Sequence, residues 1–302
     1  MKHSILILLT VFLVSCGNRQ EKEDPDRSAI PVIATVNYPL FYFAQRIGGD
    51  LIHAEFPVPA GLDPAYWVPD DEALSLFQSA DVILANGADY AKWLHNVSLP
   101  ASRIINTSQK EEEKYIRVGH GSSHSHGPDG EHEHVGFAFT TWLDFQLAAR
   151  QAESVRDVLI RKLPEHHVTL EENYRLLESD LLSLHASMIE VSTSTRGVNI
   201  IGSHLVYQYL SEAYDLDIRS IHFEPGEMPS EDQWTKFYVL LENYPSALML
   251  WEGEPLPETR VILQEKGILT VVFNPCANRP EKGDFIYIMK QNIRRLQNSI
   301  SN

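Results

Sequence analysis

Cysteine is scarce in this sequence, and so are basic residues and long apolar runs. Two cysteines in 302 residues cannot build a disulfide scaffold. Lysine and arginine number 25 against 41 aspartates and glutamates, which gives a formal net charge of -16. Such an acidic surface repels phosphate backbones, so we expect no nucleic-acid partner and regard cations as better ligands.

The apolar run over residues 5–14 is too short to cross a bilayer, but it matches the apolar region of a signal peptide. At its end, Leu13-Val14-Ser15-Cys16 have the order aliphatic, small, small, cysteine of a bacterial lipobox. We therefore predict a signal peptide over residues 1–15 and a lipid on Cys16. A plain secretory signal with an incidental cysteine is the alternative.

The next segment, residues 16–29, is polar and charged and offers nothing to bury, which predicts a flexible tether. Together with a lipid on Cys16, the tether indicates an extracytoplasmic protein anchored in a membrane, in the periplasm or at the cell surface. Lipidation would leave Cys276 as the remaining cysteine, so no intramolecular disulfide could form.

Strand-like and helical patterns alternate in two stretches of the chain, which predicts parallel sheets covered by helices. Between these stretches, apolar residues from Leu170 to Met188 recur at steps of three and four, as on a long amphipathic helix. We predict an α/β fold with two lobes, each a mostly parallel sheet flanked by helices, joined by one long backbone helix. The predicted boundaries are 30–160 for the N-terminal lobe, 161–195 for the linking helix and 196–302 for the C-terminal lobe.

The individual elements follow from the same patterns. Ser230 and Gln233 have the spacing of a capping box at the start of one helix. The expected strands are 32–36, 52–58, 81–86, 104–105, 198–202, 217–222, 247–251 and 270–273. The expected shorter helices are 39–47, 71–77, 90–94, 204–214, 230–244, 257–266 and 285–297.

Five histidines are concentrated in residues 119–136, among glycine, serine, proline and acidic residues that cannot pack a core. They are His120, His124, His126, His132 and His134. Neutral imidazole is a good ligand for zinc, nickel and copper. We predict a flexible His-rich loop that gathers metal or senses its presence, and a solvated loop without a role is the alternative.

The chain is similar to the zinc and manganese substrate-binding lipoproteins of bacterial ABC transporters. Several segments carry this resemblance, in order along nearly all of the mature chain. They are 32–50, 80–94, Trp142-Leu143-Asp144, His204, Glu254-Pro255 and Asn274-Pro275. The resemblance implies a monomeric receptor that hands a divalent cation to a membrane permease, and the His-rich loop favours zinc over manganese.

The resemblance also implies a cleft site of about three histidines and one carboxylate, drawn from both lobes. Ala65 and Thr140 stand at two histidine positions and Asn274 stands at the acidic one, so His204 alone matches. One ligand in four cannot make a tight zinc site of the usual kind.

Substitute carboxylates could complete a site around His204. Asp63 and Glu254 are our candidates with it, and Glu252 follows an apolar strand where cleft residues belong. For Asp63 the alternative is a turn residue before Pro64, and for Glu254 a surface carboxylate.

A second hypothesis gives the cleft to an organic ligand or a partner protein, with the His-rich loop as a surface zinc chelator. Aromatic and small residues would then line it: Ala65, Tyr66, Trp67, Phe137, Phe139 and Trp142. Cys276 is either a replacement ligand or inert packing. We find no catalytic motif and expect no enzyme.

Overall fold

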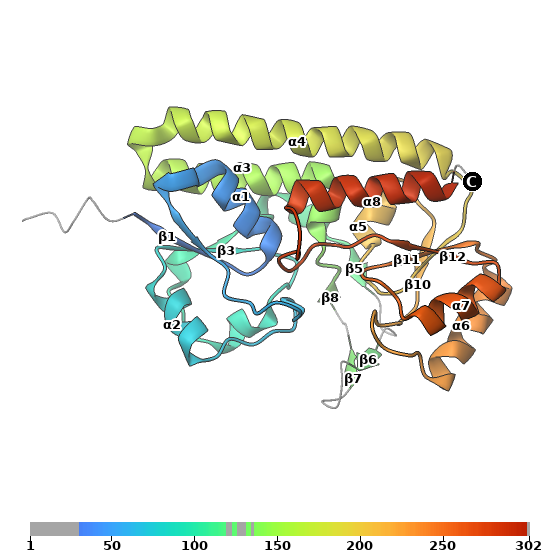
Figure 1. Cartoon of the computed structure of the whole chain (residues 1–302). Coiled ribbons are helices and arrows are strands. Elements are labelled where there is room, and N and C mark those ends of the chain that lie inside the picture. The colour runs from blue at the N-terminus through green and yellow to red at the C-terminus, as the bar shows by residue number, and fades with distance from the viewer. Residues whose placement is uncertain (1–29, 119–122, 126–130, 134–135, 301–302) are drawn as a thin grey trace, which may run out of the picture. The chain divides into compact units, whose positions relative to one another are not determined.

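The computed structural model of the chain describes most of the sequence (Figure 1). The described residues are 30–118, 123–125, 131–133 and 136–300, with the backbone alone for 123–125 and 131–133. The predicted signal peptide, Cys16 and the tether lie outside them, and so do His120, His126 and His134. No helix among the described residues is long and apolar enough to span a bilayer.

Contacts divide the chain into two units, Met1–Ile30 and Pro31–Asn302, and every element described below belongs to the second. Its first sheet has four parallel strands in the order β2-β1-β3-β4. These are β1 (Val32–Thr35), β2 (His53–Glu55), β3 (Val82–Ala85) and β4 (Ile104–Asn106). All four residues of β3 are buried, as expected for an apolar central strand covered on both faces.

The second sheet repeats this arrangement with four parallel strands in the order β10-β9-β11-β12. They are β9 (Ile200–Gly202), β10 (Ile218–Ser220), β11 (Leu248–Trp251) and β12 (Leu269–Val272). In both sheets the strand that comes first along the chain lies between the second and the third. Such a strand order creates a crevice at the carboxyl ends of the central strands of each sheet.

Helices follow the strands as predicted, and polar caps fix where several of them begin. Asn37 and Asp70 accept hydrogen bonds from the first turns of α1 and α2, and Ser230 and Gln233 form the predicted capping box of α6. The helices flanking the sheets are α1 (Tyr38–Gly48), α2 (Asp71–Ser79), α3 (Phe145–Lys162), α5 (Gln208–Ala213), α6 (Glu231–Asn243), α7 (Pro257–Glu265) and α8 (Phe285–Ile300).

The predicted linking helix is α4 (His167–Ser194), 28 residues long. Its buried residues include Leu170, Tyr174, Leu177, Leu181, Leu184 and Met188, the row that the sequence pattern predicted. It packs against α1, α3 and α8 and connects the two sheets along the chain (Figure 1). Helix α3, which precedes it, was not anticipated by the sequence patterns; its buried residues include Phe145, Val155 and Leu159.

Two short antiparallel ladders lie at the His-rich segment. The first pairs β5 (Arg117–Val118) with β8 (Gly136–Phe137), and the second pairs β6 (Ser123–Ser125) with β7 (Glu131–Glu133). The backbone of His124 lies opposite that of His132 in the second ladder.

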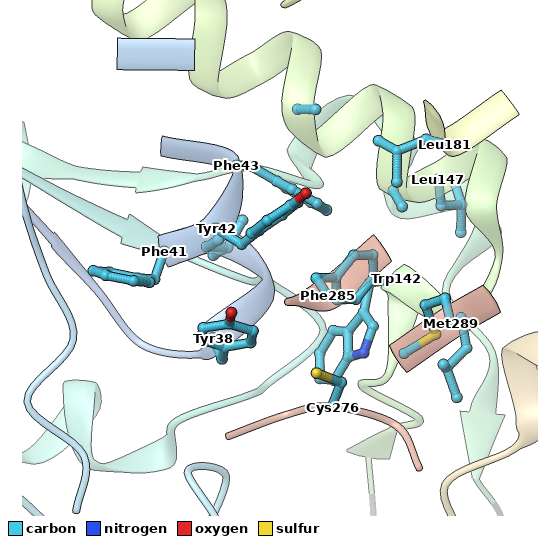
Figure 2. Packing of buried hydrophobic residues seen from close by; sticks show 14 of the residues in the cluster. Tyr38, Phe41, Tyr42, Phe43, Trp142, Leu147, Leu181, Cys276, Phe285 and Met289 are labelled. Atoms are coloured by element: carbon cyan, nitrogen blue, oxygen red, sulfur yellow. The ribbon is translucent and has the colours of Figure 1, made fainter. Parts of the chain in front are cut away.

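Cys276 belongs to the apolar core that α1, α3, α4 and α8 share (Figure 2). It is 2% exposed, and burial raises the pKa of its thiol well above the usual range. The neighbouring Pro275 accepts a hydrogen bond of 2.7 Å from the indole of Trp142. Its place in this core agrees with the packing role that the sequence analysis weighed against a ligand role.

Candidate metal centre

Histidine and glutamate side chains follow the carboxyl ends of three neighbouring strands in the second sheet. His204 comes two residues after β9, and Glu252 directly follows β11. His222 and Glu224 come shortly after β10. Parallel strands end at one edge of their sheet, so the fold brings these four side chains together.

His204, His222 and Glu224 lie close enough to share one metal ion. The Nε2 atoms of His204 and His222 are 3.6 and 3.4 Å from the same oxygen, Glu224 Oε1. One ligand atom from each of the three residues lies within 4.8 Å of the others. Ligands about 2.0–2.1 Å from a tetrahedral zinc ion are ~3.3 Å apart. The two histidine–glutamate distances are close to this value.

The cluster is sheltered but reachable. The His204 side chain is 5% exposed, whereas those of His222 and Glu224 are 20% and 27% exposed. The two imidazole rings lie 4.7 Å apart between centroids. Two imidazoles and one carboxylate are a ligand set that zinc accepts, with a coordination position left for a further ligand.

Glu252 adds a second carboxylate beside His204, with its Oε1 4.0 Å from His204 Nδ1. Burial, together with the negative charges of Glu224 and Asp63, raises the pKa of Glu252 to about 8. Burial also raises the pKa of Glu224 to about 7, assisted by the charges of Glu227 and Asp63. A divalent cation among these carboxyl groups would reverse the effect and favour their ionised forms.

Asp63 reaches the same cavity from the loop that follows β2 of the first sheet. Its Oδ1 accepts a hydrogen bond of 2.9 Å from the Ala65 amide, which is the turn role expected before a proline. The side-chain amide of Asn278 holds this loop, donating 2.8 and 2.7 Å hydrogen bonds to the carbonyls of Pro59 and Leu62. Asp63 therefore lines, on the side of the first sheet, the cavity that His204 and Glu224 also line.

Glu254 does not join this group. It is exposed and forms an ion pair with Arg260, in a separate depression beside β12. Its position is that of a surface carboxylate, which was the alternative hypothesis for this residue.

Three residues differ from the ligand pattern that the resemblance implies, and each has another role in the fold. Ala65 is buried in the core. The hydroxyl of Thr140 donates a 2.6 Å hydrogen bond to the Val206 carbonyl. The side-chain oxygen of Asn274 accepts a 2.6 Å hydrogen bond from the Cys276 amide.

A cavity of about 670 Å³ opens from the cluster and is lined from both sheets. Asp63, Glu224 and Glu252 make one part of it acidic, and His204 lines it as well. Of the aromatic residues that sequence analysis assigned to a cleft, Phe139 and Trp142 line this cavity, together with Tyr90. Trp67 packs against Trp93 instead, and Phe137 packs against Tyr115.

Tyr90 lies in a loop where a short helix was predicted over 90–94. Gly87, Ala88, Asp89 and Ala91 all have positive φ angles, between 49° and 82°. Each such alanine or aspartate costs about 1–3 kcal/mol of backbone strain, which the surrounding structure must hold in place. A 3₁₀ helix, Lys92–Asn96, begins only after this loop.

Two cluster residues were missed by the sequence reasoning. The candidates were His204, Glu252, Glu254 and Asp63, and the structure places His222 and Glu224 beside His204. For His222 a partial signal was present, because residues 217–222 were expected to be a strand and a strand's carboxyl end is where a crevice residue belongs. The side chains of the predicted loop ligands, including His124 and His132, lie outside the described residues.

The chain matches one family model over residues 32–299, and that family is described as zinc-uptake complex component A, periplasmic (ZnuA). Two relatives match nearly end to end. The metal ABC transporter substrate-binding lipoprotein SsaB of Streptococcus sanguinis is 24% identical over 315 residues, covering 99% of this chain and 97% of that protein. The manganese ABC transporter substrate-binding lipoprotein scaA of Streptococcus gordonii is 23% identical over 314 residues, covering 98% and 97%.

A solved structure has the same fold. The Zn(II)-bound ZnuA-like domain of AdcA from Streptococcus pneumoniae superposes with a TM-score of 0.75 at 20% identity, covering 90% of this chain and 99% of that one. The likeness confirms the predicted architecture of two parallel sheets flanked by helices, with one long helix between them along the chain.

Proposed function

Because this chain belongs to the family of zinc-uptake complex component A, we propose that it is an extracytoplasmic receptor that delivers a divalent cation, zinc in the first place, to an ABC permease. The membership confirms the resemblance that the sequence suggested. The family is one of transport receptors rather than enzymes, and no catalytic role is proposed.

The grouping of His204, His222 and Glu224 supports this function most directly. Their distances suit a tetrahedral zinc ion, although the family's usual ligand positions are largely substituted in this chain. Glu252 or Asp63 supplies the fourth ligand in this proposal, since both line the same cavity. The ion is the cargo of the protein, so its site must release it as well as bind it.

The capture mechanism follows from where the ligands lie. The cavity admits the cation, and the cluster after β9 and β10 binds it. The carboxylate of Asp63, which lines the cavity on the side of the first sheet, is then attracted to the bound cation. We take residues 30–160 and 196–302 as two lobes joined by 161–195. Because α4 is a long helix packed along its length, we expect small shifts between the lobes rather than wide closure.

Attachment and assembly belong to the same proposal. A lipid on Cys16 would hold the receptor at the membrane as a monomer, within reach of its permease. The lipobox sequence and the lipoprotein descriptions of SsaB and scaA support this arrangement.

Zinc titration calorimetry on the metal-stripped chain tests the function. Two forms are compared: the full chain, and a variant in which residues 120–134 are replaced by a short Gly/Ser linker. We expect the variant to retain one site of submicromolar affinity, because the cavity cluster does not include the loop. Complete loss of binding in the variant would place the metal chemistry in the His-rich loop and leave the cavity to another ligand or to none.

Zinc affinity should also fall as the pH is lowered from about 9 to 6. The pKa values of about 8 for Glu252 and about 7 for Glu224 mean that each group must lose a proton before it can bind zinc. His204 and His222 also bind in their neutral forms. Burial is the largest cause of both raised pKa values, Asp63 adds to both, and Glu227 adds to that of Glu224. One displaced proton weakens binding roughly tenfold per pH unit below the pKa.

Calorimetry at pH 7 in two buffers of different ionisation enthalpy counts the protons released. We expect about one proton or more per zinc ion, and fewer at pH 9. The Glu252→Gln variant should release close to one proton fewer at pH 7. An equal count in the variant and the wild type would show that Glu252 keeps its proton and takes no part in binding.

A further inference from the structure

The cavity is much larger than the ion that the cluster can hold. Its volume is about 670 Å³. A water molecule occupies ~30 Å³ in the liquid, so even an ion with six waters needs only roughly 200 Å³. Cavities of roughly 300–1,000 Å³ are the usual size for small organic ligands. The space beyond the metal cluster therefore suits a further molecule.

The Tyr90 hydroxyl offers such a molecule a hydrogen bond. Tyr90 is 4% exposed and lines the cavity, and no hydrogen-bond partner for its hydroxyl lies among the residues that the structure describes. A buried hydroxyl without a partner is costly, and a bound ligand would remove this cost. The strained loop from Gly87 to Ala91 holds this side chain in place.

The wall around Tyr90 is aromatic. Its ring packs edge to face against Phe139 and Trp142, at centroid distances of 5.3 and 5.6 Å. All three residues line the cavity together with Val206 and Ile288. A small hydrated cation gains no hydrophobic stabilisation from such a wall, whereas the carbon skeleton of an organic ligand does.

The rim of the cavity carries two cations in a chain whose net charge is -16. Arg279 and Lys282 line it, with one opposing charge from Glu281. Arg279 also lies over the ring of Phe41, 4.6 Å from its centroid, which fixes the guanidinium near the rim. These cations can attract carboxylates that extend outward from a metal ion bound deeper in the cavity.

We propose that the receptor takes its metal ion as a complex with a small organic chelator that carries carboxylate groups. The cluster of His204, His222 and Glu224 binds the ion. The Tyr90 hydroxyl and the rim cations bind the chelator. This inference rests on the proposed function, because it needs the ion at the cluster.

Equilibrium dialysis of the full chain against radiolabelled citrate, with and without zinc, tests the proposal. Citrate is a compact tricarboxylate that binds zinc, so it represents the class. We expect about one citrate retained per chain when zinc is present and almost none without zinc. The His204→Ala variant should lose this retention.

Two sets of variants separate the chelator contacts from the metal ligands. Tyr90→Phe removes one oxygen atom and should weaken zinc-dependent citrate retention about 2- to 12-fold, the value of one hydrogen bond. Arg279→Gln combined with Lys282→Gln changes exposed residues and should weaken it about tenfold by removing two charged partners. Tyr238→Phe, on an exposed helix face, is the matched control and should leave retention unchanged.

Zinc binding measured without citrate distinguishes a failure of the chelate proposal from a failure of the receptor function. Tyr90→Phe should bind zinc alone within about twofold of the wild type, because Tyr90 is not among the metal ligands. If the wild type retains zinc but releases citrate, the chelate proposal is wrong and the receptor function stands. If it retains neither, both fail. Retention of citrate that is equal in the wild type and in both sets of variants would also overturn the chelate proposal.

Discussion

Replacing Glu224 by glutamine should weaken zinc binding at the cavity by at least about 100-fold, more than the loss of an outer partner of a metal ligand. Glu224 Oε1 is the atom that both histidines approach, at 3.4 and 3.6 Å. The amide keeps the shape of the side chain but removes the negative charge, so the ion loses its central anionic ligand. Competition against a fluorescent zinc chelator, in the variant without residues 120–134, measures the change.

The matched control is Glu254→Gln, the same substitution thirty residues further along the chain. Glu254 is exposed and paired with Arg260, away from the cluster. Its replacement should change zinc affinity by less than about twofold. An equal, small effect of both substitutions would mean that the ion binds elsewhere, and a loss of affinity in both would point to a general effect of negative charge.

Replacing Asn86 by alanine should lower the free energy of unfolding by about 3 kcal/mol or more, because it leaves several buried polar groups without partners. Asn86 directly follows β3 and is 1% exposed. Its Oδ1 accepts hydrogen bonds of 3.2 Å from Asn37, 3.1 Å from Gln151 and 3.2 Å from Thr141. Its Nδ2 donates a 2.9 Å hydrogen bond to the Phe139 carbonyl.

This network joins α1, β3 and α3, so we expect the loss to appear as lower global stability. Thermal and urea unfolding, followed by circular dichroism, should show Tm lowered by roughly 6–12 °C. Asn243→Ala is the matched control, since this exposed amide donates only to a carbonyl of its own helix and should cost less than about 0.5 kcal/mol. A similar small cost at Asn86 would mean that water replaces the lost partners.

Alternating apolar segments were enough to predict both sheets and the linking helix, because burial of a parallel strand needs a continuous apolar run. The row from Leu170 to Met188 located the buried side of α4 for the same reason. The loop around Tyr90 could not be predicted, because alanine and aspartate rarely adopt positive φ and nothing local indicates that they do.

The candidate site was predicted in part. His204 was found through a family motif, and Glu252 through its place after an apolar strand. His222 and Glu224 match no motif position used in the sequence analysis. They lie beside His204 because β10 pairs with β9, and a single sequence does not reveal this pairing. Sequence showed which ligands were missing, whereas the order of strands in the sheet shows what takes their place.

The three residues of the metal cluster all extend from one sheet. The residues that set the zinc affinity are therefore different from those that can signal to the permease that zinc is bound. A ligand shifts a conformational equilibrium only through contacts that differ between the two conformations. Contacts within a single lobe move together, so His204, His222 and Glu224 would hold zinc in the same way however the lobes are arranged. Among the described residues that line the cavity, Asp63 is the acidic residue on the side of the first sheet. We therefore expect Asp63, and the loop that Asn278 holds, to make the bound ion felt in the first lobe.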